Sequence, residues 1–217
     1  EGINQSQIDH ARDYTFASGL RSILRQDPDI VMVGEIRDLE TAEIAINAAL
    51  TGHLMLSTLH TNDAAGALPR FIAMGVKPFL LSPALNAIIG QRLIRKICEK
   101  CKEETTLSER EMAFVKKVAS EIPPASGEVV KPETEWKFYK GKGCPVCNNS
   151  GYKGRVGIFE ILTMNEAIKG SLSEKISEYE IRNLAKEQGM VTMQQDGILK
   201  AIDGLTTVNE VLSVAGE

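Results

Sequence analysis

The chain has 217 residues, of which 43% are hydrophobic and 25% are charged, and its formal net charge is −4. This composition indicates a folded, soluble protein of one or two globular units. The longest apolar stretch, residues 79–90, is interrupted by polar residues and is far shorter than the roughly 20 residues that a membrane-spanning helix needs. We therefore expect no transmembrane segment.

The first part of the sequence predicts an α/β fold. Thr15 can cap a helix whose apolar residues share one face. Residues 30–33 form a continuous apolar run, which is the pattern of a strand covered on both faces, and residues 38–50 then form a helix. A second apolar strand follows at residues 54–56. Two strands joined by a helix form a βαβ unit, so these strands are expected to be parallel.

Polar residues follow each of these strands. Glu35 comes just after the first strand, and Thr58, His60 and Thr61 come after the second. Ligands bind at the carboxyl edge of open α/β sheets, and P-loop enzymes place acidic residues there to hold Mg²⁺ or polarise water. The alternative is a carboxylate in a solvated turn beside a surface histidine. No phosphate-cradling GxxxxGK[ST] loop occurs in the sequence, so we expect a nucleotide site to be completed by chain outside it.

The remaining elements are predicted mostly as helices. Asn62 or Asp63 can cap a helix that reaches Met74, and Ser82-Pro83 begins a long predicted helix up to Ile97. Residues 102–143 are rich in charge and proline and are predicted to form loops and short strands around one helix. Capping boxes mark that helix and several later ones: Ser108/Glu111, Thr163/Glu166, Ser177/Glu180, Thr192/Gln195 and Thr207/Glu210. The end of the chain is therefore predicted to be helical.

The four cysteines form two CxxC pairs, Cys98 with Cys101 and Cys144 with Cys147. Two such pairs can complete the tetrahedral four-thiolate shell of a closed structural zinc site. The segment between the pairs is longer than in a minimal zinc ribbon, so it is expected to carry a helix of its own. Two disulfides, a redox pair or unrelated free thiols are the alternatives.

Four segments together resemble one known family, the ATPases of type II secretion and type IV pilus assembly, the GspE/PilB group. RQDPDIVMVGEIRD resembles the family's atypical Walker B motif, and TGHLMLSTLHTNDA resembles its His box. GQRLIRKICEKC and CPVCNNSGYKGRVGIFEIL resemble the arginine-containing and tetracysteine segments of the assembly members. The resemblance covers essentially the whole chain, and the tetracysteine segment separates it from the pilus-retraction relatives.

The resemblance implies part of a RecA-like P-loop ATPase domain with parallel strands in residues 1–97. It implies a tetracysteine zinc module in residues 98–157 and a small helical subdomain in residues 158–217. Glu35 would coordinate Mg²⁺, directly or through water, and His60 would contact the γ-phosphate of ATP. The nucleotide-binding and catalytic residues expected by resemblance are Gly34, Glu35, Arg37, His60, Arg21 and Arg25. Some of the arginines are expected to face phosphate or a neighbouring subunit.

By the same resemblance, the chain would be the carboxyl-terminal part of a hexameric, cytoplasmic ATPase, held peripherally at the inner membrane by a platform protein. It would use ATP, Mg²⁺ and structural Zn²⁺. Because the P-loop and the water-activating glutamate of the family would lie before Glu1, the chain alone is expected not to hydrolyse ATP.

Two other function classes compete with this hypothesis. One is a zinc-ribbon module that binds nucleic acid or protein; residues 98–157 carry 11 basic and 9 acidic residues, a weak balance for a nucleic-acid surface. The other is thiol redox chemistry, which predicts disulfides in place of bound metal.

Overall fold

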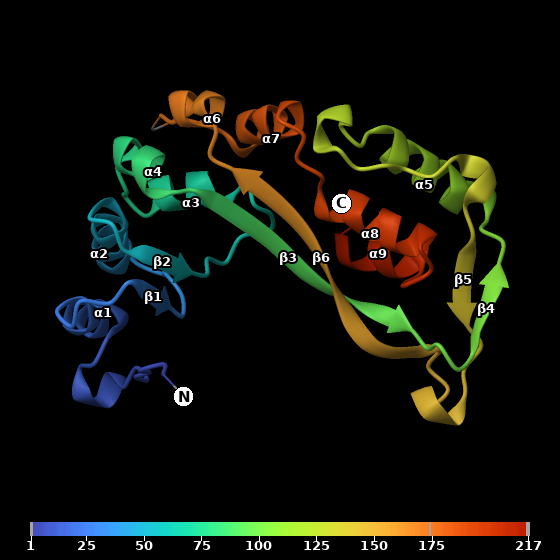
Figure 1. The fold of residues 1–217 in the computed structure, drawn as a ribbon, viewed down its shortest axis with the longest axis horizontal. Coiled ribbons are helices and arrows are strands. Elements are labelled where there is room, and N and C mark those ends of the chain that lie inside the picture. Colours follow the sequence, from blue (N-terminus) through green and yellow to red (C-terminus); the bar gives the residue numbers. More distant parts are fainter. Residues whose placement is uncertain (1, 174, 216–217) are drawn as a thin grey trace. The chain divides into compact units, whose positions relative to one another are not determined.

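The computed structural model describes residues 2–173 and 175–215 and contains two compact units (Figure 1). The first unit comprises the chain up to Ile88 together with Thr163–Arg182, and the second comprises Ile89–Leu162 together with the chain from Asn183 onward. The division into residues 1–97, 98–157 and 158–217 stays a prediction. Within the described residues, no helix combines the length and apolar character that crossing a membrane requires.

The first unit combines short helices with two strands. Its elements are the 3₁₀ helix η1 (His10–Arg12), α1 (Phe16–Leu24), β1 (Ile30–Val33), α2 (Leu39–Leu50), β2 (Leu54–Ser57), α3 (Ala67–Ala73), α4 (Pro78–Ala84), α6 (Glu166–Ser171) and the start of α7 (Glu178–Glu187). The predicted caps of the first two α-helices are confirmed: Thr15 accepts a hydrogen bond from the Ser18 N–H, and Asp38 accepts one from the Thr41 N–H.

β1 and β2 form the predicted parallel pair. Ile30 lies opposite Leu54 and Met32 lies opposite Leu56, with α2 as the connection between the two strands. The βαβ unit is therefore confirmed. Its consequence is that the residues following each strand meet at one edge of the sheet.

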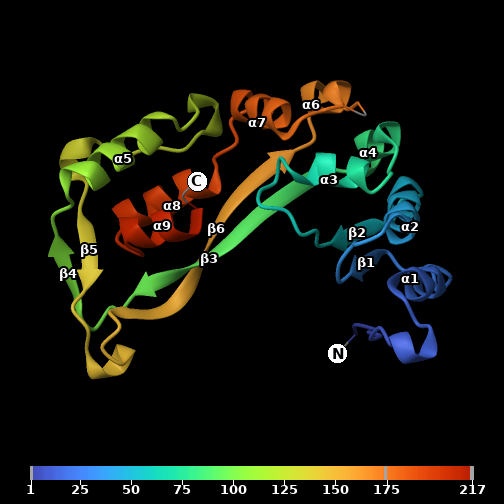
Figure 2. The same ribbon diagram turned by 180° about the vertical axis from the view of Figure 1, so that it is seen from behind.

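Only one face of this sheet is covered by other described elements. Val31 and Val33 are each 4% exposed and pack with side chains of α1 and α2, which lie on that side of the strands (Figure 2). On the other face, Ile30, Met32, Leu54 and Leu56 are 62%, 68%, 49% and 48% exposed. The prediction that the first strand is covered on both faces is therefore wrong for the described chain. The apolar run is real, but half of it has no covering element here.

The second unit is built from strand pairs and helices. Its elements are most of β3 (Ala87–Ile97), β4 (Lys102–Thr105), α5 (Glu109–Ser120), the 3₁₀ helices η2 (Pro124–Ser126) and η3 (Glu133–Glu135), β5 (Phe138–Gly141), the 3₁₀ helix η4 (Pro145–Cys147), most of β6 (Tyr152–Thr163), the end of α7, α8 (Met193–Ile202) and α9 (Val208–Ala215). β4 and β5 are antiparallel. β3 pairs with β6, and their arrows run in opposite directions in Figure 1.

The predicted helix over residues 82–97 is wrong. α4 ends at Ala84, and Ala87–Ile97 is the strand β3. Apolar side chains at residues 88, 89, 93 and 97 fit a helical stripe, whereas exposure alternates along residues 87–94 as in a strand. The pairing of this segment with β6 makes it a strand. Gly90 permits the close approach of Glu160 on β6, because a Cβ atom at Gly90 would lie only 2.7 Å from Cγ of Glu160.

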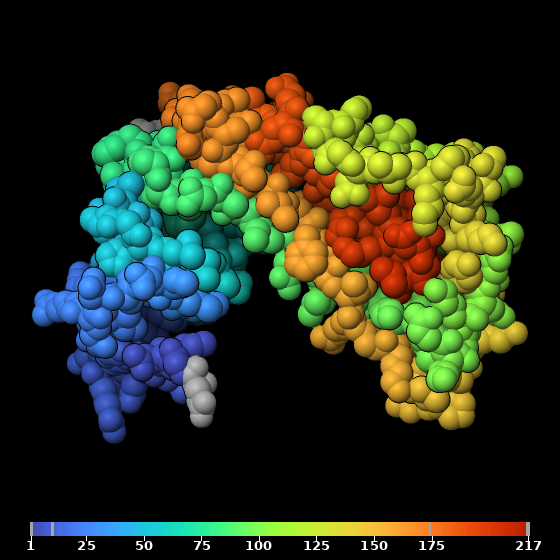
Figure 3. Space-filling view, in the orientation of Figure 1, coloured from blue at the N-terminus to red at the C-terminus, as the bar shows by residue number. Residues whose placement is uncertain are grey.

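The core of the second unit lies between its helices and strands. Val115 and Val118 of α5, Ile198 and Ile202 of α8, and Val211 of α9 belong to one buried cluster. In Figure 3, α8 and α9 (red) are surrounded by yellow-green and orange segments of this unit. The apolar faces of these amphipathic helices are thus buried against one another.

Most predicted helix starts near the carboxyl end are confirmed. Capping boxes form at Ser108 with Glu111, Ser177 with Glu180, and Thr192 with Gln195. The Thr207 hydroxyl accepts a hydrogen bond from the Glu210 N–H. The box at Thr163 is wrong, because β6 continues through Thr163 and the cap of α6 is Asn165.

One ion pair fastens β3 to α9 within the second unit. The Arg95 guanidinium donates to both carboxylate oxygens of Glu210, and the Arg95 backbone N–H donates to Glu210 Oε1 at 3.0 Å. Arg95 also lies over the Tyr152 ring, 4.2 Å from its centre. The Glu210 side chain is 6% exposed, so the carboxylate is nearly buried with its charge satisfied.

Candidate functional site

Glu35 and His60 lie in contact at the carboxyl ends of β1 and β2. Nε2 of His60 is 3.1 Å from Oε2 of Glu35. The Glu35 side chain is 21% exposed and the His60 side chain is 80% exposed. The two strongest candidates from the sequence are therefore brought together at the edge where the parallel sheet predicts a ligand.

Arg37 is the third member of this group. Its Nε lies 2.7 Å from the same Glu35 oxygen that His60 contacts. The hydrogen bond from Arg37 is the largest influence on Glu35 and lowers the pKa of its carboxyl; partial burial opposes this, and the hydrogen bond from His60 lowers the pKa further. Glu35 is consequently ionised at neutral pH, which is the state that binds a divalent cation.

The loop between β2 and α3 carries His60 and is hydrogen-bonded to the segment that follows β1. The Thr58 hydroxyl donates to the Gly34 carbonyl at 2.7 Å, and the Ile36 N–H donates to the Thr58 carbonyl at 3.0 Å. Gly34 thus contributes its backbone carbonyl to the position of the loop that carries His60. These contacts set the spacing between Glu35 and His60.

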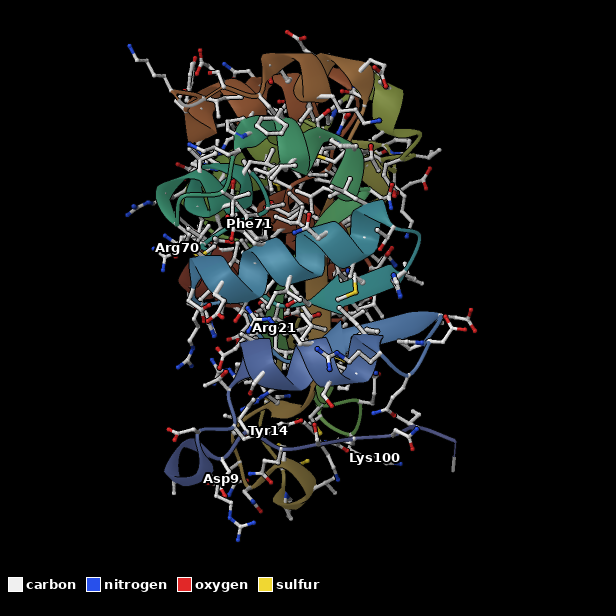
Figure 4. All side chains as sticks on the ribbon, turned by 90° about the vertical axis from the view of Figure 1, so that its left-hand side faces the viewer. Asp9, Tyr14, Arg21, Arg70, Phe71 and Lys100 are labelled. Atoms are coloured by element: carbon white, nitrogen blue, oxygen red, sulfur yellow. The ribbon has the colours of Figure 1, made fainter. Side chains whose placement is uncertain are left out.

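The other arginines expected near a phosphate lie outside this contact. Arg21 of α1 pairs with Glu40 at the start of α2 through an exposed contact of 2.7 Å. Figure 4 labels Arg21 on α1, which lies alongside α2. Arg25 is the C-cap residue of α1. The structure groups Glu35, Arg37 and His60, and it does not bring Arg21 to them.

His53, the other histidine of the His-box segment, lies at the far end of β2. Its Nδ1 is 3.0 Å from the Ala48 carbonyl and 3.3 Å from the Thr51 hydroxyl. These groups belong to the carboxyl end of α2, where side chains often satisfy the last helical carbonyls. Its contacts are thus those of a helix end.

The four cysteines form a second candidate site. Their sulfur atoms all lie within 4.8 Å of one another, and none is in a disulfide. The closest sulfur pairs are separated by 3.9 Å (Cys98 with Cys144), 3.8 Å (Cys101 with Cys147) and 3.7 Å (Cys144 with Cys147). A tetrahedral zinc with Zn–S bonds of about 2.3 Å places its sulfurs about 3.8 Å apart. The donor set and the spacing therefore fit Zn²⁺.

The surroundings of the thiols shift the pKa values of two of them in opposite directions. Burial raises the pKa of the Cys101 thiol to about 12, and hydrogen bonds with the other cysteines also raise it. Burial acts in the same direction on Cys147, but hydrogen bonds from the backbone N–H groups of Cys144 and Gly151, together with those to the side chains of Cys144 and Cys101, outweigh it and bring its pKa down to about 6. A bound cation would favour thiolates at all four positions.

Comparison with known families decides the membership of the chain. The family model described as "Type II/IV secretion system protein" matches residues 1–213. The chain belongs to this family. The predicted resemblance to the ATPases of type II secretion and type IV pilus assembly is confirmed, and the match spans both candidate sites.

Curated members of the type II/IV secretion family are closely similar. The chain is 46% identical over 212 residues to the type IV pilus assembly ATPase PilB of Thermus thermophilus, covering 98% of this chain and 23% of that protein. It is 46% identical over 217 residues to the type II secretion system protein E of Pseudomonas aeruginosa, covering 100% of this chain and 40% of that protein. The chain thus spans well under half the length of these relatives.

Solved structures agree on the fold. The pilus retraction motor PilT with bound ADP is 28% identical with a TM-score of 0.60, over 94% of this chain and 44% of that one. The ATPase DotB of Legionella pneumophila is 22% identical with a TM-score of 0.61, over 98% of this chain and 46% of that one. The α/β architecture is thus shared with these two proteins.

Proposed function

We propose that this chain is the carboxyl-terminal portion of a hexameric ATP-hydrolysing motor that powers type IV pilus assembly or type II secretion. The observation that carries the proposal is the contact of Glu35 with His60 at the carboxyl edge of a parallel β-pair, in a chain of this family. At this edge the two strands bring a carboxylate and an imidazole into contact.

In this proposal the reaction is phosphoryl transfer from ATP to water. Glu35 would hold Mg²⁺ directly or through a water molecule, and the ion would supply charge neutralisation on the phosphates. Arg37 keeps the Glu35 carboxyl ionised, and His60 donates a hydrogen bond to the γ-phosphate. The loop that carries His60 is fixed by the hydrogen bond from the Thr58 hydroxyl to the Gly34 carbonyl. Arg21 and Arg25 face phosphate or a neighbouring subunit in the assembled motor. There Arg21 gives up its exposed ion pair with Glu40 for the new contact.

The cysteine cluster would hold one Zn²⁺ through Cys98, Cys101, Cys144 and Cys147. With all four positions of a tetrahedral ion filled by thiolates, the metal supplies folding free energy and takes no part in hydrolysis. The proposed motor is cytoplasmic and attaches peripherally to the inner membrane through a platform protein. Its proposed subunit contacts are with identical copies, in keeping with the resemblance to the assembly ATPases.

The 217-residue chain carries no GxxxxGK[ST] loop, so we expect it to release no phosphate from ATP above background when assayed alone. The full-length protein proposed to contain it is expected to hydrolyse ATP. Phosphate release by both, measured with Mg²⁺ present, checks this expectation. Steady hydrolysis by the isolated chain would contradict the proposal that the ATP site needs residues outside these 217.

Replacing Glu35 with glutamine in the full-length protein is expected to lower kcat by about 10- to 100-fold, because the amide cannot supply the negative charge that holds the cation. The Mg²⁺ concentration for half-maximal rate should rise as well. Steady-state kinetics over a Mg²⁺ series measure both. Glu43→Gln, an exposed change on α2, is the matched control and should leave the rate unaltered. An unchanged rate in Glu35→Gln would remove Glu35 from the mechanism.

A further inference from the structure

The side chain of His60 is not held in place by packing. It is 80% exposed, so its position depends on the backbone of the loop formed by residues 58–66. The loop is attached at its beginning to the segment that follows β1, through the hydrogen bonds of Thr58 with Gly34 and Ile36. One attachment leaves the rest of a loop free to pivot, so the far end also needs an anchor.

Asp63 supplies that anchor three residues after His60. Its Oδ1 accepts a hydrogen bond from the Gly66 N–H at 2.8 Å, and its carbonyl accepts one from the Thr61 hydroxyl at 2.8 Å. Its Oδ2 accepts one from Nη2 of Arg182 at 2.5 Å. The Asp63 side chain is 18% exposed, so this charged contact is better shielded from water than a surface ion pair.

Arg182 reaches the loop from α7, which is 119 residues further along the chain. The same Nη2 donates to Glu178 Oε1 at 2.6 Å, one helical turn earlier on α7. The start of α7 also lies close to the start of α3, because a Cβ atom at Gly66 would be 3.2 Å from Oε2 of Glu178. Arg182 is therefore held on its own helix while it holds Asp63.

We propose that Arg182 is a positioning residue for His60, acting through Asp63 and the loop formed by residues 58–66. The proposal rests on the proposed function, in which His60 contacts the γ-phosphate. Without Arg182 the second anchor of the loop is weakened, and the imidazole spends less time beside Glu35. A displacement of about 1 Å of a catalytic group can cost up to about 100-fold in rate.

The first test is kinetic and uses the full-length protein. Arg182→Ala is expected to lower kcat about 10-fold while the KM for ATP stays the same, because the lost interaction matters in the transition state. In a His60→Ala background the same change should cause no further loss, because its effect passes through His60. Glu178→Gln removes the charge of another partner of Arg182 and leaves Asp63 intact, so its effect should be small. Additive losses in the double variant would overturn the proposal.

The second test does not depend on hydrolysis and uses the 217-residue chain. The ring signals of His60 in a proton–nitrogen NMR spectrum are expected to shift or broaden in Arg182→Ala. The signals of His53, which contacts the end of α2, should stay in place and serve as the internal reference. An unmoved His60 signal overturns the proposal, whatever the kinetics give. An inactive full-length parent protein would instead defeat the proposed function and leave this spectrum as the deciding result.

A second variant covers the case in which Arg182→Ala fails to fold. Asp63→Asn keeps a side-chain oxygen for the Gly66 N–H but loses the charge that Arg182 contacts. It should reproduce the change in the His60 signals with the thermal midpoint nearly unchanged. A folded Asp63→Asn chain with parent-like His60 signals would count against the proposal as directly as the alanine variant.

Discussion

Replacing Cys147 with serine is expected to abolish zinc binding and to unfold the segment around residues 98–157. The four sulfurs lie where β3 ends, where β4 begins and where β6 is about to begin, so one ion ties these strand ends together. Structural zinc contributes about 10–16 kcal/mol of apparent binding free energy in small zinc domains, far more than any other single change considered for this chain. The thermal midpoint should fall sharply, and the zinc content should drop from one per chain to nearly none.

Three measurements check this result together. Elemental analysis gives the zinc content, thermal unfolding by circular dichroism gives the midpoint, and thiol titration of the denatured parent chain with chelator should detect four thiols. Val146→Ser, an exposed change between two of the ligands, is the matched control and should retain one zinc. A Cys147→Ser chain that keeps its zinc and its midpoint would refute the structural site. Fewer than four thiols would favour the disulfide alternative.

Replacing Glu210 with glutamine is expected to destabilise the second unit by about 2 kcal/mol at neutral pH. Hydrogen bonds to charged groups contribute about 1.5–3 kcal/mol, and the exposure of Arg95 places the expected loss below the value for a fully buried pair. The hydrogen bond from Arg95 is the largest influence on Glu210 and lowers its pKa, while burial opposes it. The stabilisation from the Arg95–Glu210 ion pair is therefore fully present above the ordinary carboxyl pKa. It is lost as the pH falls through the lowered pKa of Glu210 in the folded chain.

Chemical denaturation of the zinc-loaded chain over a pH series measures this dependence. The parent and Glu210→Gln curves should differ most at neutral pH and should approach each other as the pH falls below the ordinary carboxyl range. Glu166→Gln changes a carboxylate that is 94% exposed and should have little effect at any pH. A difference that persists unchanged at acid pH would show that the loss does not come from the charge of Glu210.

Local signals in the sequence were sufficient for many elements. The caps at Thr15 and Asp38, the capping box at Ser108 and the apolar runs around α2 each act within a few residues, so they can be read without knowledge of the fold. The βαβ unit then follows from connectivity, and with it the meeting of Glu35 and His60. This part of the site was predictable because it depends on short-range order and on one topological rule.

Long-range partners were not predictable in this way. The sequence of β3 predicts a helix because Ile88, Ile89 and Ile97 fit a helical stripe, and the partner that makes it a strand, β6, begins 55 residues after β3 ends. Arg182 gave no sign of its contact with Asp63, since its position on an ordinary amphipathic helix suits a surface charge equally well. Only the folded arrangement of the first unit shows that the two belong together.

The uncovered face of β1 and β2 has a practical consequence for production of this chain. Four aliphatic side chains lie exposed on a two-stranded sheet, and both strands have an outer edge. Such surfaces promote strand-to-strand aggregation, so light scattering of the 217-residue chain should rise with concentration. Met32→Lys should reduce the scattering without moving the thermal midpoint, because the side chain is 68% exposed. Solubility in the test tube would then be governed by one face of one small sheet.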